Sequence, residues 1–416
     1  MMLEAIKNAF RLPDLKKRIL FTLFIVFVYR IGSYIPTPGI PIGAVKSLFQ
    51  QGGVFGFLDL FAGGALSQFA VFALGIMPYI TASIVMQLLT LVIPTLEEWS
   101  KEGPVGQRKI AQWTRYLTLL IATLNAISMT FFIKRSLALQ LDGLRIFTVV
   151  ITLIAGTAVI MWLAELITQH GIGNGMSLLI FVSIVSRFPD AVVKTYQVTS
   201  PVVLLLTLVL LIFMFVAIIY IELAQRRIPV QYAKRVVGRR VYGGGSTYLP
   251  VKINSAGVIP IIFAASFLVI PSTIAQLSGS KALESFAKVF NPGTLLYMVI
   301  YFILIIFFTF FYSAIVFNPV NIAENLQKWG GFIPGVRPGQ STAKYLNRVL
   351  TRITLPGAIF IASVAIVPPI FLRLFNVPFF GEFGGTSILI LVGVALETAR
   401  QIEAQLLMRH YEGFIK

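Results

Sequence analysis

The sequence contains no cysteine and few charged residues. Only 12% of its 416 residues are Asp, Glu, Lys or Arg, about half of the roughly 25% that is typical of globular chains. Without cysteine there is no disulfide, no thiolate nucleophile and no cysteine metal site. The presence of only two histidines argues against a histidine metal site as well. So few charges cannot cover the surface of a soluble protein of this length.

Apolar residues are abundant instead, at 57% of the chain. This content excludes a disordered chain and predicts an all-α, polytopic membrane protein, because a bilayer core needs about 20 apolar residues per helix. Ten runs qualify, and Arg30, near the end of the first, is expected to snorkel. The predicted spans are residues 19–35, 68–93, 116–133, 146–164, 175–188, 201–221, 253–280, 295–317, 353–372 and 385–406.

The distribution of basic residues predicts the orientation in the membrane. Cytoplasmic loops carry an excess of Lys and Arg. With the N-terminus inside, 24 of the 34 basic residues fall on the cytoplasmic side, and an even number of spans returns the C-terminus there. We therefore expect both termini to be cytoplasmic. No small-residue cleavage site follows the basic start, so the first span is expected to be retained.

The ten spans divide into two halves of five, residues 1–190 and 191–416. Because five is odd, two such halves have opposite orientations, which fits an inverted repeat about an axis in the membrane plane. No convincing sequence similarity links the halves, so this prediction comes from the span count alone.

Two long connections in the second half, residues 224–252 and 318–352, are strongly basic. Both are far longer than a connecting turn requires, and both are predicted to face the cytoplasm. One interpretation is that their charge only sets the topology. The other is a docking surface for an acidic partner, of which ribosomal RNA phosphate is one example.

A segment in the first half, residues 52–66, is apolar but too short to cross a bilayer. It has a glycine pair near each end, and glycine permits hinge conformations. Its polar backbone must be covered by protein or face a water-filled cavity. The segment is therefore either an interfacial re-entrant loop or a movable lid inside a pore. Asp59, inside it, is expected to face water or a partner.

A series of short strings, in order along nearly the whole chain, resembles the SecY family of bacterial protein-export channels. Each string alone is short, but together and in this order they are very specific. The matching strings are Ala73–Ile84, His170–Gly175, Gln225–Pro229, Gly238–Tyr242, Asn254–Pro260, Phe317–Pro319, Pro334–Gly339 and Phe383–Ser387.

The resemblance implies an hourglass channel of ten transmembrane helices in two pseudosymmetric halves. Such a channel translocates unfolded secretory polypeptides across the bacterial plasma membrane and releases membrane-protein segments sideways into the lipid. No ATPase or hydrolase motif occurs in the chain, so an external motor or the ribosome is expected to drive transport. No cofactor is expected. The implied partners are the SecE and SecG subunits, the SecA ATPase, the ribosome, signal-sequence-bearing polypeptides and membrane lipids.

The resemblance also implies a pore ring of isoleucines near the midplane. A ring of branched apolar side chains dewets a narrow pore and blocks ions, yet it makes no specific hydrogen bonds to a passing chain. Without the resemblance, the simpler interpretation of each of these isoleucines is a lipid-facing or core residue. The matching positions are Ile80, Ile84, Ile180, Ile184, Ile262 and Ile390.

The remaining family sites also map onto this chain. Segment 52–66 matches the plug, so the lid interpretation is favoured there; its candidate residues are Val54, Phe55, Phe57, Leu58, Asp59, Leu60 and Phe61. The SecA and ribosome docking residues implied in the two basic connections are Arg239, Arg240, Arg337, Lys344 and Arg348. The lateral gate lies between the second and third spans on one side and the seventh and eighth on the other. Gln87 lies in that region, where simple helix–helix hydrogen bonding is the alternative interpretation.

Two other functions compete with the channel. The ten spans and the repeat also suggest a secondary transporter, but a transporter should place broken helices and polar residues at the midplane, where this chain is expected to have isoleucine. The second is an intramembrane enzyme, but the sequence contains no paired catalytic residues that would support one.

Overall fold

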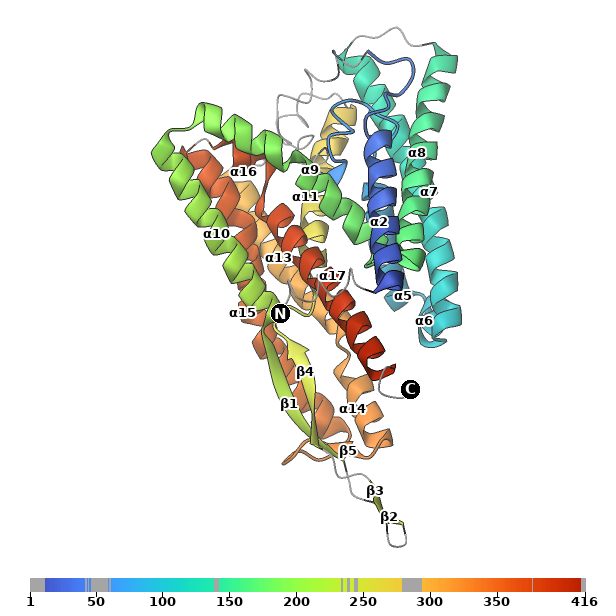
Figure 1. Cartoon of the computed structure of the whole chain (residues 1–416), viewed down its shortest axis with the longest axis vertical. Helices are drawn as coiled ribbons and strands as arrows, with labels where there is room; N and C mark the ends of the chain where they lie inside the picture. Colours follow the sequence, from blue (N-terminus) through green and yellow to red (C-terminus); the bar gives the residue numbers. More distant parts are fainter. Residues whose placement is uncertain are drawn as a thin grey trace.

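The structure is a computed structural model of the whole chain, and its fold is mostly helical (Figure 1). It describes residues 12–41, 43, 45, 59, 61–137, 142–232, 235–237, 240–242, 246–278, 294–375 and 377–412. The helices are α2 (Pro13–Gly32), α5 (Met77–Val92), α6 (Pro94–Lys101), α7 (Pro104–Ser136), α8 (Gly143–His170), α9 (Gly175–Val198), α10 (Pro201–Leu223), α11 (Ile259–Ser278), α13 (Leu295–Val316), α14 (Pro319–Lys328), α15 (Gln340–Phe375), α16 (Pro378–Glu382) and α17 (Gly385–Glu412). The strands are β1 (Gln225–Tyr232), β2 (Arg235–Val237), β3 (Arg240–Tyr242), β4 (Ser246–Lys252) and β5 (Gly331–Phe332).

The described helices confirm a polytopic membrane fold. Seven of those in the described part of the chain are long and apolar enough to cross a membrane, and the pair α5 and α6, bent by 101°, makes up to eight. Helices α2 and α11 occupy the other two predicted spans; α2 carries Lys16, Lys17 and Arg18 in its first turns. Each of the ten predicted spans contains one helix, so the structure is consistent with a count of ten.

Most helix boundaries differ from the predicted ones, among them those of α5, α9 and α15. Helix α5 begins at Met77, next to Pro78, and most of residues 62–76 form turns where a span from residue 68 is predicted. Helix α9 continues through Pro189 to Val198. Helix α15 begins at Gln340, so part of the second basic connection is already helical. Apolar composition alone does not separate a helix from a buried run of turns.

The two basic connections fold into one unit rather than two loops. Strand β1 pairs antiparallel with β4, from Gln225 opposite Lys252 to Gln231 opposite Ser246, and its end pairs with β5 of the second connection. Ile228 and Val230, two residues apart on β1, are both buried, as the alternation of a strand requires. They share a small apolar cluster with Leu346 of α15. Figure 1 shows the β1–β4 hairpin projecting from one end of the helix bundle.

Two hydrophobic clusters fill the helix bundle. One is built mainly from α2, α7, α8, α9 and the turns of residues 61–76, with Ile390 and Val394 of α17 added. The other is built from helices α10, α11, α13, α15 and α17. The outer faces carry exposed apolar side chains, such as Leu205, Phe213 and Val216 on α10, which suit a lipid environment. The pseudosymmetry of the halves 1–190 and 191–416 stays a prediction.

Close packing around Gly156 of α8 gives a first testable prediction. A methyl group added there would lie 2.0 Å from the carbonyl oxygen of Val71, so Gly156→Ala must push residues 61–76 away from α8. Such overpacking typically costs about 1–3 kcal/mol. We expect a lower Tm for this variant in detergent, measured by tryptophan fluorescence.

Gly143→Ala is the matched control, because Gly143 begins the same helix and a methyl group there meets nothing within 4 Å. We expect its Tm to equal or exceed that of the unmodified protein. Equal Tm values for the two variants would contradict the packing described.

Candidate functional site

The isoleucines predicted to form the ring come from four helices, α5, α9, α11 and α17. Ile180, Ile184 and Ile390 are buried in the first hydrophobic cluster. Ile80 and Ile262 are half-buried and pack against it, and Ile84, one turn after Ile80, is also half-buried. Five of the six are thus brought together in one cluster. Core isoleucine packs in the same way, so the ring stays a prediction.

The end of the predicted plug reaches the same cluster. Asp59 and Phe61 are helical and buried, with exposed fractions of 2% and 1%. Phe61 is a member of the cluster that holds Ile180 and Ile184. The other plug candidates, Val54, Phe55, Phe57, Leu58 and Leu60, lie outside the described residues.

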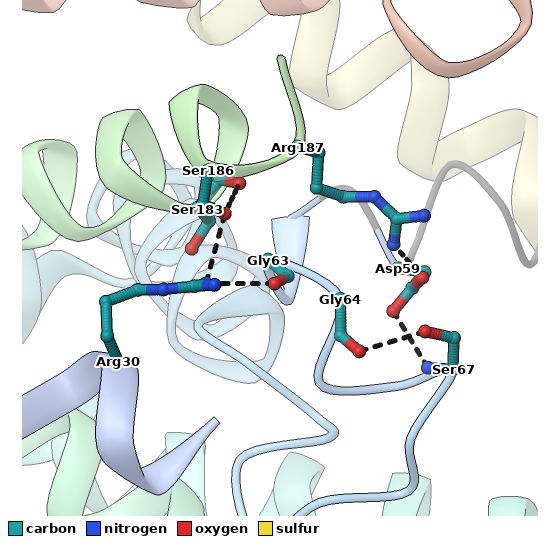
Figure 2. Close-up of polar contacts among 8 residues, drawn as sticks. All are labelled: Arg30, Asp59, Gly63, Gly64, Ser67, Ser183, Ser186 and Arg187. Atoms are coloured by element: carbon teal, nitrogen blue, oxygen red, sulfur yellow. Dashed lines mark hydrogen bonds and ion pairs between the residues drawn. The ribbon is translucent and has the colours of Figure 1, made fainter. Parts of the chain in front are cut away.

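Asp59 finds its partner inside the protein. Its carboxylate forms an ion pair with Arg187 of α9, and its other oxygen accepts a hydrogen bond from the backbone N–H of Ser67 at 2.9 Å (Figure 2). The Asp59 side chain is 3% exposed and that of Arg187 is 21% exposed. From the sequence, Asp59 is expected to face water or a partner; in the structure its partner is Arg187.

Arg30 contacts the turn that follows Asp59. Its Nη1 donates to the carbonyl oxygen of Gly63 at 3.0 Å and to Oγ of Ser186 at 3.0 Å (Figure 2), and its Nη2 donates to Oη of Tyr34 at 3.1 Å. The expected snorkelling is therefore corrected: half-buried Arg30 joins α2 and α9 to the turn within segment 52–66. Three hydrogen bonds offset the loss of water around the charge.

The turn itself requires glycine. Gly63 and Gly64 have φ of +64° and +88°, a region that other residues rarely adopt. A methyl group on Gly63 would lie 3.1 Å from Nη1 of Arg30 and 3.1 Å from Cα of Ser183. Gly64 also donates its N–H to the carbonyl oxygen of Asp59 at 3.0 Å. The second glycine pair of segment 52–66 is therefore a tight turn seated on α9.

The residues after this turn are fixed to α2 and the loop that follows it. Thr37 N–H donates to the carbonyl oxygen of Phe69 at 2.9 Å, and Val71 N–H donates to that of Ile35 at 2.8 Å. The ring of Phe72 stacks on Tyr29, with centroids 5.8 Å apart. Tyr29 in turn shares a 2.7 Å hydrogen bond with Ser183 of α9. Contacts with α2, with the loop after it and with α9 therefore fix the position of these residues.

Sequence reasoning missed Arg187. The residue lies at the end of the predicted span 175–188, only two positions before Pro189. A charge beside apolar residues in a membrane segment is usually paired, so Arg187 is expected to have a partner. The sequence does not identify that partner, because Asp59 is 128 positions away.

Three of the predicted docking residues, Arg337, Lys344 and Arg348, lie at the end of the bundle that carries the hairpin. Arg337 is exposed in the turn before α15, and its carbonyl oxygen accepts a hydrogen bond from Oγ1 of Thr342 at 2.9 Å. Lys344 and Arg348 are exposed and four residues apart on α15, so they share a face. Arg239 lies outside the described residues; Arg240 begins β3, and its side chain is not described.

The predicted lateral gate corresponds to α5 and α7 on one side and α11 and α13 on the other. Helix α5 packs on α7, α11 packs on α13, and α7 contacts α11. Gln87 lies on α5, and its Oε1 is buried with no hydrogen-bond partner among the described residues. A helix–helix hydrogen bond through this atom is therefore absent from the described contacts.

No group of three or more His, Asp or Glu side chains that could hold a metal ion occurs among the described residues.

Sequence comparison relates the chain to translocase subunits. The SecY family model matches residues 70–399. The protein translocase subunit SecY of Streptomyces scabiei is 49% identical over 445 aligned residues, with both chains covered completely. The subunit of the same name from Aquifex aeolicus is 46% identical over 430 aligned residues, again with full coverage of both.

Structure comparison finds the same fold in solved channels. A protein-conducting channel superposes with a TM-score of 0.61 at 17% identity, over 96% of each chain. A SecY structure, described by a plug domain that stabilises the closed state and maintains a membrane seal, has a TM-score of 0.64 at 18% identity, also over 96% of each chain. Sec61 in a canine ribosome–channel complex has a TM-score of 0.58 at 16% identity and the same coverage.

Proposed function

The chain belongs to the SecY family of protein translocase subunits, and from this premise we propose how its residues let a polypeptide cross a membrane. Its function is that of a protein-conducting channel for unfolded polypeptides, as in its relatives and in the structures that share its fold. The observation that carries the mechanism is the convergence of isoleucines from α5, α9, α11 and α17 on one cluster that includes Phe61 of the plug.

The isoleucines form the seal of the closed channel. Their side chains are branched and apolar, so a narrow passage between them dewets and blocks ions. They offer no specific hydrogen bonds, so they yield to an extended chain of any sequence. Ile180, Ile184 and Ile390 are buried here, which suits a closed passage.

Segment 52–66 closes the passage as a plug. Phe61 packs in the same cluster as the isoleucines, and Asp59 holds the segment against α9. The tight turn at Gly63 and Gly64 supplies a pivot for its displacement.

The basic unit built from the two connections docks the energy source. Arg337, Lys344 and Arg348 are exposed, and the sequence places Arg239 and Arg240 in the first basic connection. Arginine offers a bidentate fork to carboxylates and phosphates, so the surface suits the SecA motor and ribosomal RNA. The sheet that joins β4, β1 and β5 gives this surface a fixed shape. SecE and SecG are the proposed companion subunits.

Membrane-protein segments leave through the gap between α5 and α7 on one side and α11 and α13 on the other. Parting of α7 from α11 opens this route to lipid, and Gln87 lies on one wall of it. In this proposal the bundle lies in the bacterial plasma membrane, and the hairpin and both termini face the cytoplasm, in keeping with the excess of Lys and Arg on that side.

The natural absence of cysteine allows a direct test of the pore. We expect a stalled secretory chain to crosslink to single cysteines placed at Ile84, Ile184 and Ile262, because these residues line its path. The stalled chain carries a single cysteine of its own, and the readout is the adduct on a denaturing gel after a bifunctional thiol reagent joins the two cysteines.

Ile212→Cys is the control, since Ile212 is 56% exposed on the outer face of α10. This position should give no crosslink to the stalled chain. If all three pore positions behave like Ile212, the proposed path is wrong.

Arg337→Glu tests the docking surface. The exposed side chain makes a charged contact with the motor in this proposal, so reversal of its charge should slow motor-driven export by on the order of tenfold, equivalent to about 1.4 kcal/mol. Membrane insertion and abundance should not change. The measurement is the rate of translocation of a secretory precursor into membrane vesicles.

Lys328→Glu reverses a charge on an exposed residue of the same connection, in α14, and serves as the control. We expect it to retain most of the export rate. A normal rate for Arg337→Glu would remove Arg337 from the docking surface.

A further inference from the structure

We propose that Asp59 and Arg187 form an ionic latch that determines how readily a signal-bearing chain opens the channel. Asp59 belongs to the plug, and Arg187 belongs to α9, a wall of the bundle. In this proposal Arg30 holds the pivot of the plug at Gly63. The latch rests on the proposed function of segment 52–66 as a plug.

Burial makes the pair mutually dependent. The Asp59 side chain is 3% exposed, and the carboxylate accepts hydrogen bonds from Arg187 and from the backbone of Ser67. A buried charge that loses its partner is strongly destabilising, because water cannot replace the lost contact. In the closed site, neither charge is therefore tolerated without the other.

The contacts divide the region into a fixed part and a part that can swing. Residues 69–72 are held by backbone bonds to Ile35 and Thr37 and by the stacking of Phe72 on Tyr29. Asp59, on the other side of the Gly63–Gly64 turn, is held to α9 through its carboxylate. Displacement of the plug about the turn must therefore break the pair with Arg187 but can leave residues 69–72 in place.

The pair acts differently in the two states of the channel. In the closed state each charge is satisfied by the other, whereas in the open state both face the aqueous vestibule and are hydrated. Removal of one partner strands the other only in the closed state. The equilibrium then shifts toward the open state, and a weaker signal suffices to complete the opening. Asp59 and Arg187 are thus specificity-determining residues for transport.

A second ion pair in the bundle provides an internal comparison. Nε of Arg115 on α7 lies 2.5 Å from Glu165 on α8, and both side chains are partly exposed. This pair joins two helices and is not among the contacts of Asp59 or of residues 63–67. A general loosening of the bundle should follow from its loss, but not a release of the plug.

The test compares Asp59→Asn, Arg187→Gln and the double variant in translocase reconstituted into proteoliposomes. Asn has the shape of Asp, Gln is a shorter polar replacement for Arg, and both substitutions remove the charge. We expect each single variant to raise the resting ion conductance, and the export of a precursor with a weakened signal sequence, by on the order of tenfold, or about 1.4 kcal/mol. The double variant should show less than the product of the two single effects, because it strands no charge.

Arg187→Lys and Arg115→Gln are the controls. Lys keeps the positive charge of Arg187 but lacks the bidentate guanidinium. The resting conductance of Arg187→Lys should therefore lie between that of the unmodified protein and that of Arg187→Gln. The second should leave the resting conductance unchanged. Equal conductance increases for Arg115→Gln and Arg187→Gln would overturn the latch. If Arg187→Gln fails to accumulate, the resting conductance of Arg187→Lys is the deciding measurement. A conductance of Arg187→Lys no higher than that of the unmodified protein would overturn the proposal.

Failure of the latch is distinguishable from failure of the proposed function. If the unmodified translocase exports the precursor and the Asp59 and Arg187 variants keep its low conductance and signal selectivity, the latch is wrong and the channel function stands. If the unmodified translocase exports no precursor under motor-driven conditions, the proposed function itself fails.

Discussion

The need to satisfy backbone polar groups within the bilayer governs this structure. Residues 61–76 run through the bundle mostly as turns, and a non-helical backbone is tolerated there only where protein or trapped water covers it. The protein meets this constraint with contacts from α2 and α9. Ile35 and Thr37 pair with the run along its backbone, and Arg30 donates to the carbonyl oxygen of Gly63. The position of the plug is therefore set by hydrogen bonds as well as by apolar packing.

This arrangement separates two properties that a protein channel must combine. Apolar packing of Ile180, Ile184 and Phe61 seals without regard to sequence, because dispersion contacts have little directional preference. The ion pair of Asp59 with Arg187 is directional and is lost as a unit. Displacement of the plug must break this pair as well as the apolar packing, so the pair adds to the free energy that opening requires. The seal and the threshold for opening thus depend on different residues.

The sequence predicts the membrane bundle well, because bilayer thickness fixes the length of an apolar span and each of the ten predicted runs contains a helix. It predicts less where contacts join distant residues. The start of α5 at Met77 is missed, since the turns before it are as apolar as a helix. Two contacts join positions about a hundred residues apart, and local patterns do not reveal them. They are the pairing of Gln231 with Phe332 and the pairing of Asp59 with Arg187.

Arginine has two roles in this chain, and burial decides between them. Arg30 and Arg187 lie within the bundle and are committed to internal acceptors, so their charges hold segments together and are released only when the fold moves. Arg337 and Arg348 are exposed beside the hairpin, where water already solvates them and a partner can replace that water without straining the protein. A basic residue near the docking end is therefore suited to an exchange of partners during each transport cycle. One inside the bundle is suited to hold a closed state until a signal-bearing chain displaces it.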